Sequence, residues 1–490
     1  MKIRSIQSGS FKLFAITVML ALLTASCEKE KVLLNPVPET SILDANAFDT
    51  PDRVLGLVNG IYAKVKDPQF YGGKYVQYGE FRGEEFINRT QNIFTGYDAW
   101  SHTLNSNSNE VQMLWTAAYG AINAANVFLK GLNDNLSKVD PLLAKQYEAE
   151  AKFSRALTYF SLVTLYAKPY VADNGASPGL PLRLEAETTT SNNDLARSTV
   201  ATVYAQILKD LNDAEAALPA SYSTDLVNTT RAHKNTAIAL KSRIYLNMGN
   251  YAKVMEEARK IVSEAAPFRA SSGVLHQLQE DVRVVFNTNY TTTESIFSMP
   301  MTDLNSATGQ NAIGFIFNAA PIGNAEYSLN PAGIIGNTEW RTTDSRRSFV
   351  TVAGTASFLK KFNKPSPYTD YVPVIRYSEV LLNYAEAAAK SGDVSKSLAL
   401  LNAVRRRSDP GFSFQASRTD TPEALFNTIL LERRIEFLGE GHRSNDLLRN
   451  LLTIPAKGSS SLTSPAIPPS HQAYIFPLPN SEILTNKLLL

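Results

Sequence analysis

The 490-residue chain contains a single cysteine, Cys27, and this limits how the folded protein can be stabilised. No intramolecular disulfide can form, so a buried apolar core has to hold the fold together. A chain of this length can bury one large core or form two to three smaller units. The formal charge is only +2, and no dense Lys/Arg stripe is present, so we expect no nucleic-acid partner.

The residues before Cys27 are organised like a secretory leader. Three cations precede an apolar run over residues 13–23, and small residues follow that run. The run has 11 residues, whereas a helix that spans a bilayer needs about 20. We therefore expect residues 1–26 to be a signal peptide.

The end of the leader resembles the lipobox of bacterial lipoproteins, although Thr24 occupies the position where leucine is usual. The resemblance implies that Cys27 carries the lipid, palmitate included, and that residues 27–48 form a lipidated tether. Residues 28–31 weakly resemble a surface-export signal of Bacteroidetes. The alternative is an ordinary signal peptide with an incidental cysteine. No other apolar stretch approaches spanning length, so we expect the lipid to be the only membrane anchor.

Helical periodicity dominates the chain after the tether. Apolar residues recur at helical spacing on both sides of Gly249 and of Gly392, and each pattern breaks at a short glycine turn. Both segments resemble tetratricopeptide units, which are helix pairs of about 34 residues. Their turns lie 143 residues apart, which predicts interrupted hairpins and not a continuous solenoid. The sequence therefore predicts a mostly α fold, with a further long helix from Ala144 to about Ala167.

Two regions, residues 68–110 and 264–370, have no sustained helical period. Both are rich in Asn, Gly and aromatic residues. Loops of this length are usually functional or disordered, and the aromatic content argues against disorder. We expect both regions to be ordered, irregular segments inserted between helices.

No constellation of residues predicts catalysis, a cofactor or a metal site. The five histidines have no metal-ligand spacing, and the chain has neither a phosphate-binding glycine loop nor a nucleophile elbow. Glu84 and Glu85 could form a glycosidase pair, but adjacent acids are common surface features. We interpret the Arg405–Arg407 run as cations that complement a helix dipole. The charges within 431–437 are interpreted as an ion network that fixes helix packing.

Residues 431–437, followed by 440–443 and 446–449, resemble the C-terminal signature of the SusD/RagB-like family, the surface nutrient-binding lipoproteins of Bacteroidetes. Ser444 and Asn445 stand where an aromatic residue is usual. Further segments match in the right order; they are residues 149–160, 231–249, 374–387 and 475–486. The chain is identified as similar to this family over essentially its whole length, with an N-terminal region over 49–230 and a C-terminal region over 231–490.

The resemblance implies a loop-rich ligand-binding face beside the tetratricopeptide-like hairpins. It also implies a SusC-like TonB-dependent transporter in the cell outer membrane, over which the lipoprotein acts as a lid. The expected function is non-catalytic: the protein captures oligosaccharides and delivers them to this transporter. A peptide-binding RagB-like protein, a helical scaffold without a small ligand, and a surface glycosidase using Glu84 and Glu85 are the alternatives.

Aromatic residues in the two irregular regions are candidates for glycan contacts, because sugar C–H faces stack on flat rings. The leading candidates are Trp100 and Trp340, joined by Tyr71, Tyr97 and Tyr327. Polar residues of the first region could add hydrogen bonds; they are Asn88, Gln91, Asn92 and Asp98. The family motifs do not include ligand residues, so none is transferred from the resemblance.

Overall fold

The structure, a computed structural model, describes residues 46–189, 191, 193–287 and 290–489. The described residues divide into two units, one ending at Val54 and the other beginning at Leu55. Helix α3 (Pro51–Val65) begins in the first unit, where the Arg53 guanidinium donates to the Asn46 carbonyl at 3.1 Å. The predicted signal peptide, Cys27 and most of the predicted tether lie outside the described residues.

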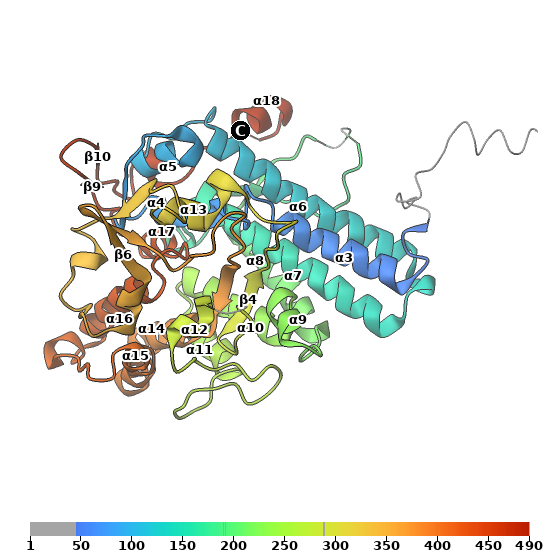
Figure 1. Cartoon of the computed structure of the whole chain (residues 1–490). Helices are drawn as coiled ribbons and strands as arrows, with labels where there is room; N and C mark the ends of the chain where they lie inside the picture. Colours follow the sequence, from blue (N-terminus) through green and yellow to red (C-terminus); the bar gives the residue numbers. More distant parts are fainter. Residues whose placement is uncertain (1–45, 190, 192, 288–289, 490) are drawn as a thin grey trace, which may run out of the picture. The chain divides into compact units, whose positions relative to one another are not determined.

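Three long helices of the second unit pack side by side (Figure 1): α6 (Asn109–Asp134), α7 (Pro141–Tyr166) and α8 (Val200–Ala217). Most residues of α7 are buried, and many of them are apolar or small. The helix begins before the predicted Ala144, because the Asp140 carboxylate accepts the amides of Leu142 and Leu143 at 3.0 Å and Pro141 occupies the first turn.

Both predicted hairpins are present. The first is α10 (Lys234–Asn247) with α11 (Tyr251–Arg259), and the second is α14 (Tyr377–Lys390) with α15 (Val394–Ser408). Gly249 and Gly392 end the first helix of each pair with φ of 67° and 85°, a left-handed conformation that favours glycine. Helix α14 packs against α11 and against α16 (Pro422–Glu436). The prediction of a mostly α fold with interrupted hairpins is confirmed.

The two irregular regions contain short elements and meet in a small sheet. Strand β1 (Phe86–Asn88) of the first region pairs antiparallel with β5 (Tyr327–Leu329) of the second. Four further two-stranded antiparallel sheets are β2–β3 (Pro178–Pro181, Arg197–Thr199), β4–β8 (Ser295–Met299, Val372–Arg376), β6–β7 (Val350–Ala353, Ala356–Leu359) and β9–β10 (Lys457–Gly458, Thr463–Ser464). The remaining α-helices are α4 (Lys74–Phe81), α5 (Tyr97–Ser101), α9 (Asp225–Thr230), α12 (Val282–Asn287), α13 (Ile313–Phe317), α17 (Arg443–Leu448) and α18 (Asn480–Thr485).

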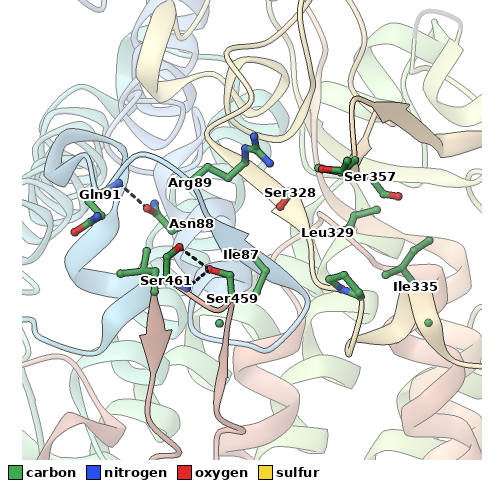
Figure 2. A pocket seen from close by; sticks show the side chains of 16 residues that line it. Ile87, Asn88, Arg89, Gln91, Ser328, Leu329, Ile335, Ser357, Ser459 and Ser461 are labelled. Atoms are coloured by element: carbon green, nitrogen blue, oxygen red, sulfur yellow. Dashed lines mark hydrogen bonds between the residues drawn. The ribbon is translucent and has the colours of Figure 1, made fainter.

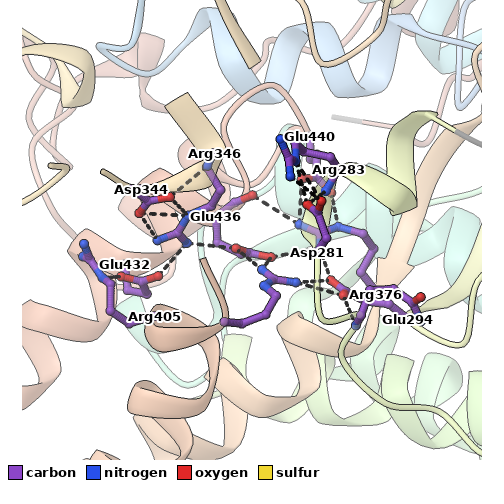
Figure 3. Close-up of polar contacts among 12 residues, drawn as sticks. Asp281, Arg283, Glu294, Asp344, Arg346, Arg376, Arg405, Glu432, Glu436 and Glu440 are labelled. Atoms are coloured by element: carbon purple, nitrogen blue, oxygen red, sulfur yellow. Dashed lines mark hydrogen bonds and ion pairs between the residues drawn. The ribbon is translucent and has the colours of Figure 1, made fainter. Parts of the chain in front are cut away.

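A network of buried ion pairs surrounds the C-terminal half of α16 (Figure 3). Its acidic members are Glu294, Asp344, Glu432, Glu436 and Glu440, and its basic members are Arg346, Lys361, Arg376, Arg405 and Arg407. The predicted ion network of α16 is therefore confirmed. The interpretation of the arginine run was incomplete: Arg405 and Arg407 are buried partners of these glutamates, and only Arg406 is exposed.

Within the described part of the chain, no helix combines the length and the apolar composition needed to cross a bilayer.

Candidate functional site

A cavity of about 630 Å³ opens beside the β1–β5 sheet (Figure 2). Its walls come from both irregular regions, because strand pairing places Ile87 opposite Ser328. The β6–β7 hairpin forms a further wall through Thr355 in its turn and Ala356 and Ser357 at the start of β7. The β9–β10 hairpin, with Ser459, completes the lining. The two irregular regions therefore meet at this sheet, a pairing that the sequence did not predict.

One side chain shapes the turn after β1. The side-chain oxygen Oδ1 of Asn88 accepts the backbone amides of Thr90 at 3.2 Å and Gln91 at 2.7 Å, which is the hydrogen-bonding pattern of an Asx turn. Gln91 follows with φ of 54°, and the Arg89 amide pairs with the Glu326 carbonyl at 3.0 Å. This turn places Arg89 and Gln91 at the cavity, so the predicted polar residues Asn88 and Gln91 both line it.

Arg89 is the only charged residue among those that line the cavity. Its guanidinium lies 5.3 Å from the centre of the Phe358 ring. Neutral hydroxyl and amide side chains provide the other polar groups, and Ile87, Leu329 and Ile335 provide apolar surface. Such a surface can donate and accept many hydrogen bonds while also contacting C–H groups.

Phe94 follows the same turn and is not among the predicted ligand residues. Its side chain is 60% exposed, and it is the only aromatic residue of the described chain in the exposed class. The 3-10 helix η2 (Ile93–Thr95) presents it, and the Asn92 side chain caps that helix by accepting the Phe94 amide at 3.0 Å. The one sequence signal for Phe94 is an aromatic residue in an irregular segment, and many buried aromatic residues have the same signal. Exposure alone separates Phe94 from them.

Three of the predicted ligand aromatics lie in and beside the β1–β5 sheet and do not line the cavity. Trp100 is fully buried, and its indole N–H donates to the Phe86 carbonyl at 2.8 Å. The half-buried Tyr97 stacks on Trp100 with ring centres 6.1 Å apart. Tyr327 is fully buried and stacks on Phe81 at 3.9 Å. These rings support the strand that carries the cavity residues.

The other two predicted aromatics lie elsewhere. Tyr71 is 2% exposed, and its hydroxyl is hydrogen-bonded to Ser161 at 2.9 Å. Trp340 is also 2% exposed, with the Arg347 guanidinium 4.1 Å from its ring centre. The five predicted aromatics are therefore not brought together around one cavity, and the structure exposes a different ring, Phe94, near the sheet.

Glu84 and Glu85 are buried and engaged by arginines. The Glu84 carboxylate receives two hydrogen bonds from Arg443, at 2.6 and 2.9 Å, and Glu85 lies 2.6 Å from Arg434. Burial alone would raise the pKa of Glu84, but the charges of Arg443 and Arg434 hold it below its usual value. The pKa of Glu85 is raised by burial and by the negative charge of Glu84. Across the described residues, no group of three or more His, Cys, Asp or Glu side chains could hold a metal ion.

Two family models match the chain, and together they cover both of its halves. One, described as "Starch-binding associating with outer membrane", matches residues 40–246, and the SusD family model matches residues 231–490. The second match alone spans more than half of the chain. The protein belongs to the SusD family.

Relatives match almost the full chain. The SusD-like protein P2 of Formosa agariphila is 25% identical over 534 aligned positions, covering 98% of both chains. A crystal structure of a SusD superfamily protein from Bacteroides fragilis has a TM-score of 0.82 and 31% identity, covering 90% of this chain and 99% of that one. A laminarin-binding SusD-like protein shares the fold, with a TM-score of 0.70, 21% identity, and coverage of 90% of this chain and 99% of that one.

Proposed function

We propose that the protein is a non-catalytic glycan-binding lipoprotein that holds an oligosaccharide in the cavity beside the β1–β5 sheet. The single observation that carries this proposal is the lining: hydroxyl, amide and guanidinium groups beside apolar patches, with no carboxylate among the lining residues. Oligosaccharides present many hydroxyls next to apolar C–H faces and match such a surface. The laminarin-binding relative supports the use of this fold for glycans.

Phe94 is the proposed stacking ring of this site. It is exposed, and it follows the Asn88–Gln91 turn that forms one wall. Full burial of a Phe side chain contributes about 1.5–3 kcal/mol, so partial cover of the Phe94 ring by a sugar face adds a modest part of the binding energy. One modest ring contact, together with hydrogen bonds from the cavity lining, suits a protein that must capture a ligand and then release it.

In this proposal the protein delivers the oligosaccharide to a SusC-like TonB-dependent transporter in the outer membrane, and Cys27 carries the lipid anchor. The outer-membrane association of the matched family supports the location. Catalysis is not part of the proposal. Glu84 forms an ion pair with Arg443 and Glu85 forms one with Arg434, so neither carboxylate is free to act on a glycosidic bond.

Isothermal titration calorimetry tests the ligand class. The protein is titrated with neutral polysaccharides, including laminarin, and separately with a mixture of peptides. We expect saturable binding to at least one glycan, weakened about ten-fold or more by Arg89→Ala. Arg283→Ala is the matched control, since Arg283 is 50% exposed and lies outside the cavity. Binding to peptides with no binding to any glycan would contradict the glycan-binding hypothesis and support a peptide-binding function.

A further inference from the structure

A second cavity, of about 410 Å³, lies between the chain segment after α5 and the segment that precedes α18. Its charged and titratable lining residues are Arg82, His102 and His471, and no carboxylate is among the lining residues. Thr103, Asn105 and Ser106 add neutral hydrogen-bonding groups. None of its lining residues is shared with the cavity beside the β1–β5 sheet.

Arg82 is a buried cation for which the described residues provide no acidic partner. Its side chain is 1% exposed, and Nη2 donates to the carbonyls of Ala473 at 2.8 Å and Tyr474 at 2.6 Å. Nη1 is buried and has no hydrogen-bond partner among the described residues. The Phe476 ring covers the guanidinium at 5.3 Å. A buried cation without a counter-charge is unfavourable, so an arginine in this state favours binding of an anion.

His102 is the second unsatisfied group of this cavity. Both of its ring nitrogens are buried and have no hydrogen-bond partner among the described residues. Burial, followed by the positive charges of Lys457 and Arg82, lowers the pKa of His102 to about 2, so the ring is neutral and one nitrogen carries a donor proton.

Lys457 is a further buried basic group, and its positive form acts on His102. Its Nζ is buried and donates to the carbonyls of Phe81 and Gly83. Burial lowers the pKa of Lys457, and Glu84 opposes this shift only in part. The Glu84 carboxylate is itself bound by Arg443, so it does not neutralise the cavity.

We propose that this second cavity binds an oxyanion, either a carboxylate or a sulfate group, which Arg82 Nη1 and His102 hold by hydrogen bonds. Guanidinium groups bind such anions through short, charge-assisted hydrogen bonds. The anion has two sources: a free inorganic ion, or the acidic group of a sugar whose hydroxyls contact Thr103, Asn105 and Ser106. The site is separate from the proposed glycan cavity and does not depend on it.

The chain has only five histidines, so histidine ring NMR signals report on this site directly. Sodium sulfate, glucuronate and glucose are titrated separately into the full-length protein at constant ionic strength. We expect a saturable shift of the His102 signal with sulfate or glucuronate and none with glucose, while the buried His276 signal stays in place. Sulfate alone would identify a free oxyanion, and tighter binding of glucuronate would identify an acidic sugar. No saturable shift with either anion would overturn the proposal.

Two variants separate anion binding from general electrostatic effects. Arg82→Gln removes the cation, and we expect anion affinity to fall at least about ten-fold, as judged by the His102 signal. Arg89→Gln removes a cation from the other cavity and should leave this affinity unchanged. If Arg82→Gln does not fold, His102→Asn replaces it, because asparagine tolerates the φ of 62° at this position. Sulfate binding to His102→Asn, followed by calorimetry, should be weakened; unchanged affinity would contradict the assignment.

Discussion

The Nη1 atom of Arg376 lies 2.9 Å from the Oε1 atom of Glu436, in the interior of the second unit. The Glu436 carboxylate also forms ion pairs with Arg346 at 2.9 Å and Arg407 at 2.6 Å. Three cations from different elements therefore contact one carboxylate at the end of α16. The surrounding network contains five acidic and five basic side chains (Figure 3), so its formal charge is balanced. Removing one member leaves an uncompensated buried charge.

Glu436→Gln should destabilise the protein strongly. The substitution keeps the size of the side chain but leaves Arg346, Arg376 and Arg407 with one negative charge too few, and breaking a buried pair costs about 3–5 kcal/mol. Urea unfolding followed by circular dichroism measures the loss. Glu256→Gln, on the exposed face of α11, is the matched control and should leave the midpoint unchanged. A wild-type midpoint for Glu436→Gln would show that the network is not a stabilising element.

Stability should fall as the pH is lowered below about 4.5. Burial alone would raise the pKa of Glu436, but the charges of Arg407, Arg376 and Arg346 outweigh burial and hold it well below the usual value. A group with a lowered folded-state pKa contributes stability above its unfolded pKa and loses it as the pH falls towards its folded pKa. Urea midpoints at pH 7, 4 and 3 should therefore decline, and the decline should be shallower in Glu436→Gln. A flat profile would contradict this account.

Glu80 should behave in the opposite way. It is 1% exposed, Oε1 accepts the Gly441 amide at 2.7 Å, and Oε2 has no partner among the described residues. Burial raises the pKa of Glu80 to about 8, so its contribution is favourable below the unfolded pKa and is lost as the pH rises through 8. Glu80→Gln should gain on the order of a few kcal/mol at pH 9 and little at pH 5, at about 1.4 kcal/mol per pKa unit. Equal unfolding free energies of the two proteins at pH 9 would contradict the assignment.

The sequence predicted those parts of the fold whose signals are local. Glycine turns at Gly249 and Gly392 mark the hairpins, and the alternating charges of α16 indicated an ion network. Which arginines complete that network could not be predicted, because Arg346 and Arg376 lie in irregular or strand segments far from α16 in sequence. Asp140 followed by Pro141 is a typical helix start, so the beginning of α7 before Ala144 could have been predicted from the sequence.

The sequence predicted which two regions contribute to the candidate site, but it did not predict which aromatic residues are exposed there. Aromatic residues in irregular segments pack into the core or face solvent according to long-range pairing. Trp100, for example, is held by the Phe86 carbonyl, whereas Phe94, a few residues earlier, is exposed. No periodicity distinguishes these two outcomes. Asn88 and Gln91 were predicted as polar ligand candidates, but the lone charge of Arg89 became visible only when the β1–β5 pairing assembled the cavity.

Cys27→Ala should be exported but lose membrane retention, because the proposed lipid has no other attachment point. Fractionation of cells that lack the transporter measures this, with the wild-type protein as the control. Release of the variant into the soluble fraction is the expected result. Retention of the variant in the membrane fraction of those cells would show that another element anchors the protein.

Titration of the best-binding glycan into a cavity-blocked variant tests the central claim most directly. Ala356→Trp places an indole in the cavity wall on β7, and Val352→Trp is the matched control on the paired strand β6, where the side chain is 70% exposed and outside the lining. By isothermal titration calorimetry, we predict that Ala356→Trp abolishes glycan binding while Val352→Trp binds like the wild type. Wild-type affinity in a folded Ala356→Trp protein would contradict the assignment of this cavity as the ligand site.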